Sequence, residues 1–207
     1  MVTLKVDKLA KSYASVPVFR NLSFQYSGGV IGIAGPNGSG KSTLLRCVSG
    51  LALPTSGTVN WSVNGDDYSN KTISLVLGYA APYVSLYEEL TASENLQFIH
   101  DLRSSQACEP ISDLIQNYEL SEFSDSLFGE LSSGQQQRVK LAAAAVHRPA
   151  TLCLDEPGTN LDEAGHRIIK RMIRSCAENA GLVLLASNQT RELDLCDHIL
   201  QVSDSNL

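Results

Sequence analysis

Three segments in the first third of the chain alternate apolar and polar residues, which is typical of half-buried strands. The apolar positions are Val2, Leu4 and Val6, then Leu22, Phe24 and Tyr26, then Val59, Trp61 and Val63. Asn64-Gly65 follows the third segment and is a strong hairpin-turn signal. These segments predict an antiparallel β part. The almost wholly apolar run Val30–Ala34 within it predicts a central parallel strand.

Apolar runs and helical patterns alternate along the rest of the chain, which predicts a parallel sheet flanked by helices. Further strands are expected at Ile73–Ala80, Thr151–Asp155, Val183–Ser187 and His198–Val202. Helices are expected at Ser42–Ser49, Thr91–Leu102, Ile111–Leu120 and Gln135–His147, and after Asp162 up to about Gly181. Thr91 and Glu94 have the spacing of a capping box, and Asp162 is a good helix N-cap.

Composition places the chain among soluble globular proteins. Of its 207 residues, 43% are hydrophobic and 18% are charged, and the net charge is −6. We therefore expect no broad nucleic-acid surface. No apolar run approaches a membrane span, and the first residues lack the apolar core of a signal peptide. The five widely spaced cysteines are expected to be free thiols of a cytosolic protein.

A glycine-rich segment, GPNGSGKST, has the spacing of a phosphate-binding loop. It comprises Gly35, Pro36, Asn37, Gly38, Ser39, Gly40, Lys41, Ser42 and Thr43, and it follows a predicted strand and opens a predicted helix. The glycines let successive N–H groups converge on phosphate oxygens, and the helix N-terminus favours an anion. Lys41 is expected to reach the β- and γ-phosphates, and the Ser42 hydroxyl to ligate Mg²⁺.

The apolar strand expected at Thr151–Asp155 ends in two consecutive acids, Asp155 and Glu156. Asp155 is expected to hold Mg²⁺ through water. Glu156 faces the other side of the strand or leaves it, so that it could act as general base for a water beside the γ-phosphate. An acidic cap of a turn is the structural alternative for this pair.

The segment Leu131–Pro149 begins with LSSGQ, in which hydroxyl residues precede a helix. Ser132, Ser133 and Gly134 could leave free N–H groups at that helix N-terminus, forming a second anion site. A plain N-cap is the alternative.

Together these motifs resemble the ATP-binding cassette (ABC) superfamily over almost the whole chain. GPNGSGKST matches the family's phosphate loop, LCLDEP its acidic strand, and LSSGQ is similar to its LSGGQ signature, with Ser133 in place of a glycine. The resemblance implies a P-loop NTPase fold of α/β class, with a mainly parallel core sheet, an N-terminal antiparallel β subdomain and an inserted helical subdomain. One domain is expected, with its ATP-binding core at about 1–82 and 149–207 and its helical signature subdomain at about 83–148.

The resemblance also implies roles for further residues. Two subunits would sandwich two ATP molecules, so that Ser132, Ser133, Gly134, Gln135 and Asp162 contact ATP held by the partner. Tyr13 is similar in position to the family's aromatic residue that stacks on adenine, although an ordinary β-surface tyrosine is the alternative.

Two positions depart from the family pattern. The family's glutamine, which contacts Mg²⁺ and the attacking water, falls on Pro82, which has no side-chain oxygen. The nearby Tyr83 and Tyr87 could contact a partner or pack within the helical part. The family's histidine that senses the γ-phosphate falls on Asn188, which can donate a hydrogen bond but carries no positive charge. We therefore expect slow or partner-dependent turnover.

The expected function is an ATP-hydrolysing subunit that powers a membrane transporter through ATP-driven dimerisation, at the cytoplasmic face of a membrane. Its partners would be a second ABC ATPase subunit and integral membrane permease subunits. The compact length suggests no appended regulatory domain and is similar to that of exporter ATPases. A slow or non-hydrolysing ATP switch and a soluble ABC protein acting on nucleic acid or ribosomes remain as alternatives.

Overall fold

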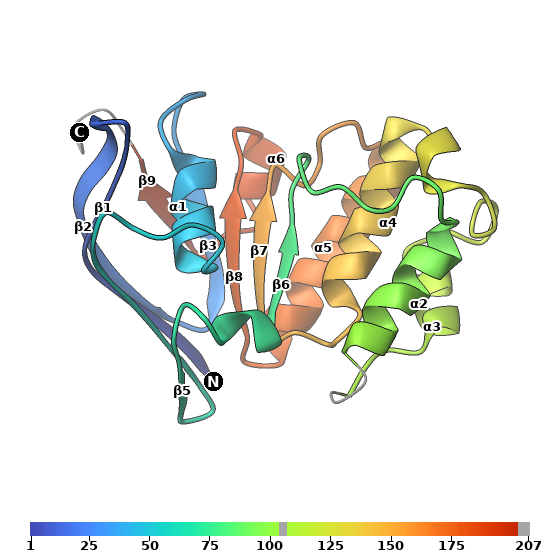
Figure 1. The fold of residues 1–207 in the computed structure, drawn as a ribbon, viewed down its shortest axis with the longest axis horizontal. Helices are drawn as coiled ribbons and strands as arrows, with labels where there is room; N and C mark the ends of the chain where they lie inside the picture. Colours follow the sequence, from blue (N-terminus) through green and yellow to red (C-terminus); the bar gives the residue numbers. More distant parts are fainter. Residues whose placement is uncertain (104–106, 203–207) are drawn as a thin grey trace.

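The protein is described by a computed structural model that covers residues 1–103 and 107–202. It is built in three parts along its longest axis: an antiparallel sheet, a parallel sheet and a group of helices (Figure 1). The last five residues of the predicted core lie outside the described residues.

The antiparallel sheet has the order β2-β1-β4-β5. Its strands are β1 (Val2–Tyr13), β2 (Val16–Ser27), β4 (Ser56–Val63) and β5 (Asp66–Tyr68). Asn64 and Gly65 both have positive φ, 53° and 96°, and they join β4 to β5, as the hairpin signal predicts. The alternating residues Val2, Leu4 and Val6 are buried, so the period-2 pattern is confirmed.

The parallel sheet has the order β6-β7-β8-β3-β9. Its strands are β3 (Gly29–Ala34), β6 (Leu77–Ala80), β7 (Thr151–Asp155), β8 (Leu182–Ala186) and β9 (His198–Gln201). The expected strand at Ile73–Ala80 is shorter than predicted, because Ile73–Leu75 forms a 3₁₀ turn, η1. Ile73 is buried in that turn, so its apolar character reflects packing of a turn and not a strand.

Helices cover both faces of the parallel sheet (Figure 1). They are α1 (Lys41–Val48), α2 (Ala92–Leu102), α3 (Ile111–Asn117), α4 (Ser133–Ala145), α5 (Glu163–Glu178) and α6 (Thr190–Leu193), with a second 3₁₀ turn, η2, at Phe128–Glu130. The predicted capping box at Thr91 and Glu94 and the predicted cap at Asp162 are both confirmed. Helix α3 ends before the predicted Leu120, since Glu119 has a positive φ of 54°.

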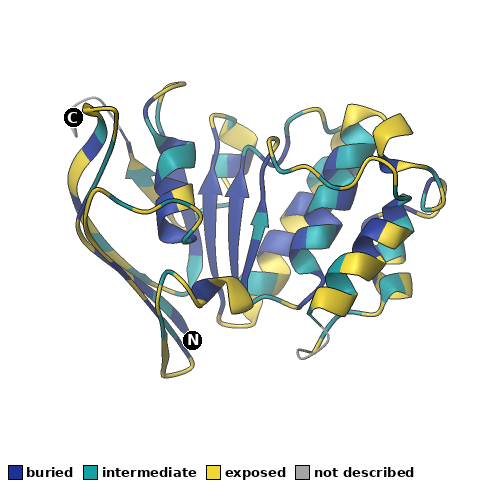
Figure 2. Ribbon diagram, in the orientation of Figure 1, coloured by how far each residue is buried: buried dark blue, intermediate teal, exposed yellow. Residues whose placement is uncertain are grey.

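Alternation along the parallel strands divides the core in two. Leu182, Leu184 and Ala186 pack with α1 and the antiparallel sheet, whereas Val183 and Leu185 pack with α4 and α5. The strands are buried on both faces, which explains their continuous apolar sequences (Figure 2).

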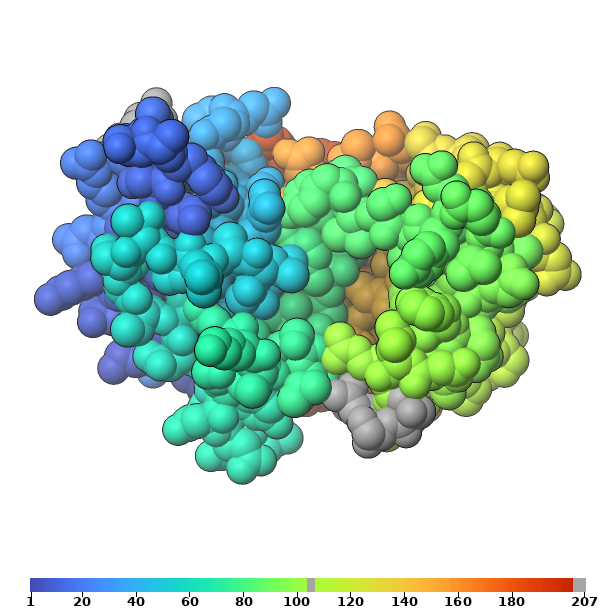
Figure 3. Space-filling view, viewed as in Figure 1, coloured from blue at the N-terminus to red at the C-terminus, as the bar shows by residue number. Residues whose placement is uncertain are grey.

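In the space-filling view, the antiparallel sheet covers one end of the molecule and the helices α2 and α3 the other (Figure 3). All five cysteines are free. Among the described residues, no helix combines the length and apolar character needed to cross a membrane.

Candidate functional site: the carboxyl edge of the parallel sheet

The segment Gly35–Thr43 links β3 to α1 and lies at the carboxyl edge of the parallel sheet. Gly38 and Gly40 adopt φ values of 83° and 98°, which ordinary side chains rarely tolerate. A Cβ on Gly40 would also lie 2.6 Å from Val18 Cγ1. The glycines therefore let the loop turn sharply into α1, so that backbone N–H groups and a helix N-terminus face one place.

Lys41 begins α1 and is only 5% exposed, with its ammonium bent back over the loop. Its Nζ donates to the carbonyls of Gly35, at 2.8 Å, and Pro36, at 3.0 Å. An ammonium has three N–H donors, so it can hold the loop and still bind an anion above it. The Ser39 hydroxyl is buried beside it and has no hydrogen-bond partner in the described chain.

Ser42 and Asp155 are brought together from distant parts of the sequence. Ser42 Oγ donates to Asp155 Oδ1 at 3.0 Å. Asp155 is 1% exposed, and its other oxygen, Oδ2, has no hydrogen-bond partner among the described residues. Burial raises the pKa of the Asp155 carboxyl, while the hydroxyls of Ser42 and Tyr83 lower it. A buried carboxylate oxygen without a partner beside a hydroxyl is what a hard cation such as Mg²⁺ requires.

Three adjacent strands end side by side at this edge. Ile33 of β3 and Asp155 of β7 both lie next to Ala186 of β8 in the sheet register. Glu156 leaves the strand with a positive φ of 44°, and its N–H donates to the Ala186 carbonyl at 2.8 Å. Glu156 therefore lies just beyond the end of β7, which is one of the two positions expected for it.

Asn188 lies one residue beyond the buried Ser187, at the end of β8. Its side-chain amide donates to the Asn37 side-chain carbonyl of the phosphate loop. Asn188, which is expected to take the place of the family's γ-phosphate-sensing histidine, thus lies beside the phosphate loop. Its position at the end of the strand had predicted this location.

Pro82 follows β6 at the joint with the helical part and is exposed. Its carbonyl accepts a hydrogen bond from Lys140 Nζ of α4 at 2.8 Å. Tyr83 turns back toward Tyr79 and the α1 residue Arg46, whereas the Tyr87 ring packs edge-on against Phe98 at 5.2 Å.

The signature segment forms a separate cluster at the N-termini of α4 and α5. Ser132 and Gln135 close a reciprocal capping box, and Ser133 is exposed. Asp162 Oδ1 accepts from Gly165 N and from Arg138 of α4, each at 2.8 Å. In the part of the chain that the structure describes, this cluster makes no hydrogen bond to Gly35–Thr43.

Gly134 fits against the loop that leads to Asp162. A Cβ added there would lie 2.9 Å from the Asn160 carbonyl. The small residue therefore allows the helix N-terminus to approach that loop closely.

Tyr13 ends β1 and is 46% exposed. The Lys11 ammonium lies 4.7 Å from its ring centroid. The same β1–β2 hairpin touches the phosphate loop, because Val18 of β2 lies against Gly40. An exposed aromatic ring is thus carried by the hairpin that adjoins the loop.

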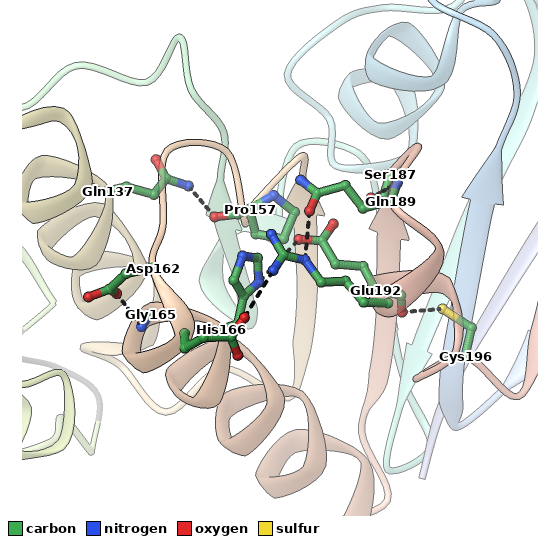
Figure 4. Close-up of polar contacts among 11 residues, drawn as sticks. Gln137, Pro157, Asp162, Gly165, His166, Ser187, Gln189, Glu192 and Cys196 are labelled. Carbon is green, nitrogen blue, oxygen red and sulfur yellow. Dashed lines mark hydrogen bonds and ion pairs between the residues drawn. The ribbon is translucent and has the colours of Figure 1, made fainter.

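Glu192 and His166 support the loops of the site and were not identified from the sequence. Glu192 is 1% exposed, and its Oε1 lies 4.0 Å from His166 Nδ1 (Figure 4). A Cβ on Gly158 would lie 2.1 Å from Glu192 Oε1, so the loop after Glu156 packs directly on this carboxyl. Burial raises the pKa of Glu192, and its neighbours Ser187 and Gly158 lower it. A lone Glu in the four-residue helix α6 carries no sequence pattern that separates it from a surface acid.

The family model described as "ABC transporter" matches residues 19–159. A curated relative, the probable multidrug ABC transporter ATP-binding protein YbhF of Escherichia coli, is 34% identical over 186 residues. That match covers 88% of this chain and 32% of YbhF, so the chain spans about a third of that relative.

Other relatives are similar over most of their own length. The cytochrome c biogenesis ATP-binding export protein CcmA of Mannheimia succiniciproducens is 34% identical over 188 residues, covering 90% of this chain and 87% of CcmA. The uncharacterised ABC transporter ATP-binding protein YdbJ of Bacillus subtilis is 32% identical over 207 residues, covering 99% and 67%.

Solved structures share the fold. The dimeric ATP-binding cassette MJ0796, in a post-hydrolysis state bound to ADP and phosphate, superposes with a TM-score of 0.84 at 22% identity, covering 96% of this chain and 94% of that one. A putative ABC transporter ATP-binding protein from Pyrococcus furiosus superposes with a TM-score of 0.79 at 23% identity, covering 97% of each chain. These likenesses confirm the predicted fold class.

Proposed function

The chain belongs to the ABC transporter family of ATP-binding proteins, and from this premise we propose that it binds ATP with Mg²⁺ and hydrolyses it to drive a membrane transporter. The observation that carries the proposal is the pairing of Ser42 and Asp155, with a buried carboxylate oxygen left free beside a phosphate-binding loop.

We propose that the loop Gly35–Thr43 binds the triphosphate. Its N–H groups, the α1 N-terminus and the Lys41 ammonium together supply positive potential for an anion. Tyr13, on the adjoining hairpin, would stack its exposed ring on the adenine.

Ser42 and Asp155 would hold Mg²⁺, which supplies charge neutralisation to the β- and γ-phosphates when bound. The fit rests on the free Oδ2 of Asp155 and on hard oxygen donors, which this cation prefers. The chain must keep Asp155 ionised and oriented toward the proposed Mg²⁺ position, and the Ser42 hydrogen bond would contribute to both.

We propose Glu156 as the general base. It leaves the strand beside Asp155, so its carboxylate can accept a proton from a water in front of the loop. Asn188 would donate its amide hydrogen bond to the terminal phosphate in place of its present acceptor, Asn37.

We propose that two subunits assemble head to tail, so that Ser132, Ser133, Gly134, Gln135 and Asp162 complete the partner's ATP site. Support comes from the physical separation of this cluster from its own phosphate loop and from its helix N-termini and exposed hydroxyls. The relative MJ0796 is described as dimeric.

Transport would require membrane permease subunits, because the chain would act at the cytoplasmic face of a membrane and contribute no span of its own among the described residues. The relatives are named as ATP-binding proteins of transporters, of which CcmA is an export protein. Residues 1–82 and 149–207 would form the ATP-binding core and residues 83–148 the helical signature subdomain. The net charge of −6 disfavours nucleic acid as a partner.

A second candidate, an ATP-dependent switch with slow or no turnover, is favoured by two specific residues. Pro82 brings no side-chain oxygen to the joint after β6, and Asn188 cannot carry a positive charge at the end of β8. Both departures affect hydrolysis more than binding.

The test is phosphate release by the purified chain, alone and with co-purified membrane partners, measured beside Glu156→Gln. We expect Glu156→Gln to lower turnover by about 10²–10⁴-fold and to leave ATP affinity unchanged. Glu178→Gln, at the far end of α5, is the matched control and should behave like wild type.

The two candidates give different outcomes. A wild-type chain that dimerises on ATP without hydrolysing it in either setting establishes the switch. A chain that binds no ATP with Mg²⁺ overturns both.

A further inference from the structure

A cleft of about 610 Å³ lies at the amino edge of the parallel sheet, the edge opposite the phosphate loop (Figure 1). It is lined by residues of α3, the end of α4, one face of α5 and the segments that enter β7 and β8. None of the described residues that line it belongs to the phosphate loop or to the pair Ser42 and Asp155. Small-molecule sites usually enclose about 300–1,000 Å³. The cleft is therefore large enough for a ligand and is separate from the proposed ATP site.

Much of the lining is apolar. Leu114 of α3, Leu152 of β7 and Met172 of α5 are all buried and all line the cleft. The α5 residues of the lining recur at three- and four-residue spacing, so that one continuous face of this helix is turned to the cleft. An aliphatic group could bury its surface against these side chains.

The polar groups of the lining leave one cation without a counter-ion. Arg148 is paired with Glu109, with Nε and Oε2 2.5 Å apart. Arg171 forms no ion pair within the described chain, and of its five N–H donors one is used, in a hydrogen bond to the Asn117 backbone carbonyl. Its remaining donors are available to an anion in the cleft.

The outer surface of α5 adds positive charge beside Arg171. Arg167, Lys170 and Arg174 are exposed and form a second, shallower hollow together with Arg171. Within the described chain these three side chains make no hydrogen bond or ion pair. The whole chain carries a net charge of −6, so this helix surface is a local positive region on an acidic protein. Such a region attracts anions to the mouth of the cleft.

We propose that the cleft binds a soluble amphiphilic carboxylate, with an aliphatic chain packed on Leu114, Leu152 and Met172 and a terminal carboxylate paired with Arg171. A guanidinium can donate two parallel hydrogen bonds to a carboxylate. The apolar lining disfavours a small hydrophilic anion, and the free arginine disfavours a cationic amphiphile. The ligand would contact both the helical part, through α3, and the core, through α5. This binding does not depend on the proposed binding of ATP.

The test is calorimetric binding of decanoate to the wild-type chain and to three variants. Two further probes separate the contributions: 1-decanol keeps the chain without the charge, and butyrate keeps the charge with little chain. Arg171→Gln removes the guanidinium, whereas Ser175→Trp places a bulky side chain at an exposed position of the lining and leaves Arg171 intact. Arg20→Gln, an exposed arginine of β2 outside the lining, is the matched control.

We expect Arg171→Gln to weaken decanoate binding by about 10-fold or more, because a hydrogen-bonded charged partner is lost. Its affinity for 1-decanol should equal that of wild type. Ser175→Trp should weaken the binding of both decanoate and 1-decanol, Arg20→Gln should match wild type, and butyrate should bind much more weakly than decanoate. Equal urea unfolding midpoints show that the variants are folded, and Ser175→Trp tests the site without breaking the hydrogen bond between Arg171 and Asn117.

Three results overturn the inference and leave the proposed function standing. The first is a wild-type chain that binds no decanoate. The second is undiminished decanoate binding by Ser175→Trp, which would place the ligand elsewhere. The third is an Arg171→Gln variant that binds decanoate as wild type does, or loses decanoate and 1-decanol equally, since neither outcome is compatible with a carboxylate paired with Arg171.

Discussion

The Asn188 side-chain amide donates a hydrogen bond to the side-chain carbonyl of Asn37, joining the end of β8 to the phosphate loop across 151 positions of sequence. The two amides hold each other at the surface of the site, both in exposed residues. The Asn188 amide could exchange its acceptor, from Asn37 to a phosphate oxygen, without a movement of β8.

We predict that Asn188→Ala lowers ATP turnover by about 10-fold or more while changing ATP affinity less, since a hydrogen bond to a charged group contributes about 1.5–3 kcal/mol. Asn188→His should raise turnover above wild type, because an imidazolium can carry positive charge to the phosphate. Phosphate release and equilibrium ATP binding are measured for both variants.

Gln189→Ala is the neighbouring control for Asn188, since its side chain accepts from Arg191 and points along α6. If Asn188→Ala leaves turnover and affinity unchanged, the sensor role is wrong.

The buried His147 is expected to make the folded protein less stable in mild acid. Burial, with a smaller contribution from Arg103, lowers the pKa of its imidazole from 6.5 to about 4. On acidification, the unfolded chain therefore takes up this proton at a higher pH than the folded chain does. The contribution of neutral His147 to the free energy of unfolding is complete above about pH 6.5 and is lost as the pH falls toward 4. The loss should reach at most about 3 kcal/mol.

Urea unfolding at several pH values checks this prediction. His147→Leu should flatten the slope between about pH 6.5 and pH 4. Part of the slope should remain, because burial also lowers the pKa of His166.

Asp162 is expected to stabilise α5 as its N-cap, independently of any role in ATP binding. Asp162→Ala should lower the free energy of unfolding by about 1 kcal/mol, because Gly165 N–H loses its acceptor. Asp162→Asn should cost only a few tenths of that, since asparagine caps helices equally well. Denaturant unfolding of the two variants separates the cap from the ion pair with Arg138, and equal losses would contradict this explanation.

Trp61 fastens the antiparallel sheet to the end of α1. Its indole Nε1 donates to the Val48 carbonyl at 2.8 Å in a buried position. Trp61→Phe should destabilise the fold by about 1–3 kcal/mol by leaving that carbonyl unpaired, and Trp61→Ala by about 3–5 kcal/mol through an added cavity. Thermal or urea unfolding measures both, and a Trp61→Phe variant as stable as wild type would contradict the hydrogen-bond contribution.

The features that sequence predicts well here are those with local causes. Thr151–Asp155 forms β7 with the expected bounds, because a short apolar run between helices has one buried conformation. The capping box at Thr91 and the cap at Asp162 follow from side chains that bond within one turn. The phosphate loop has the predicted strand and helix on either side.

Features with distant causes were missed. Nothing local in Ile73–Leu75 distinguishes a 3₁₀ turn from the start of a strand. The position of Glu192 depends on Gly158, whose proximity to it exists only in the folded chain. The sequence predicted that Pro82 lacks a side-chain oxygen, but not that its carbonyl accepts a hydrogen bond from Lys140 of α4.

Trp61 is the only tryptophan among 207 residues. Excitation at the red edge of the absorption band therefore selects a single emitter, held by a hydrogen bond at the far end of the helix that Lys41 opens. Helix α1 spans only eight residues, so an ion that shifts its first turn also changes the surroundings of the indole. Nucleotide titrations can thus be recorded without a label, from light emitted at one known place.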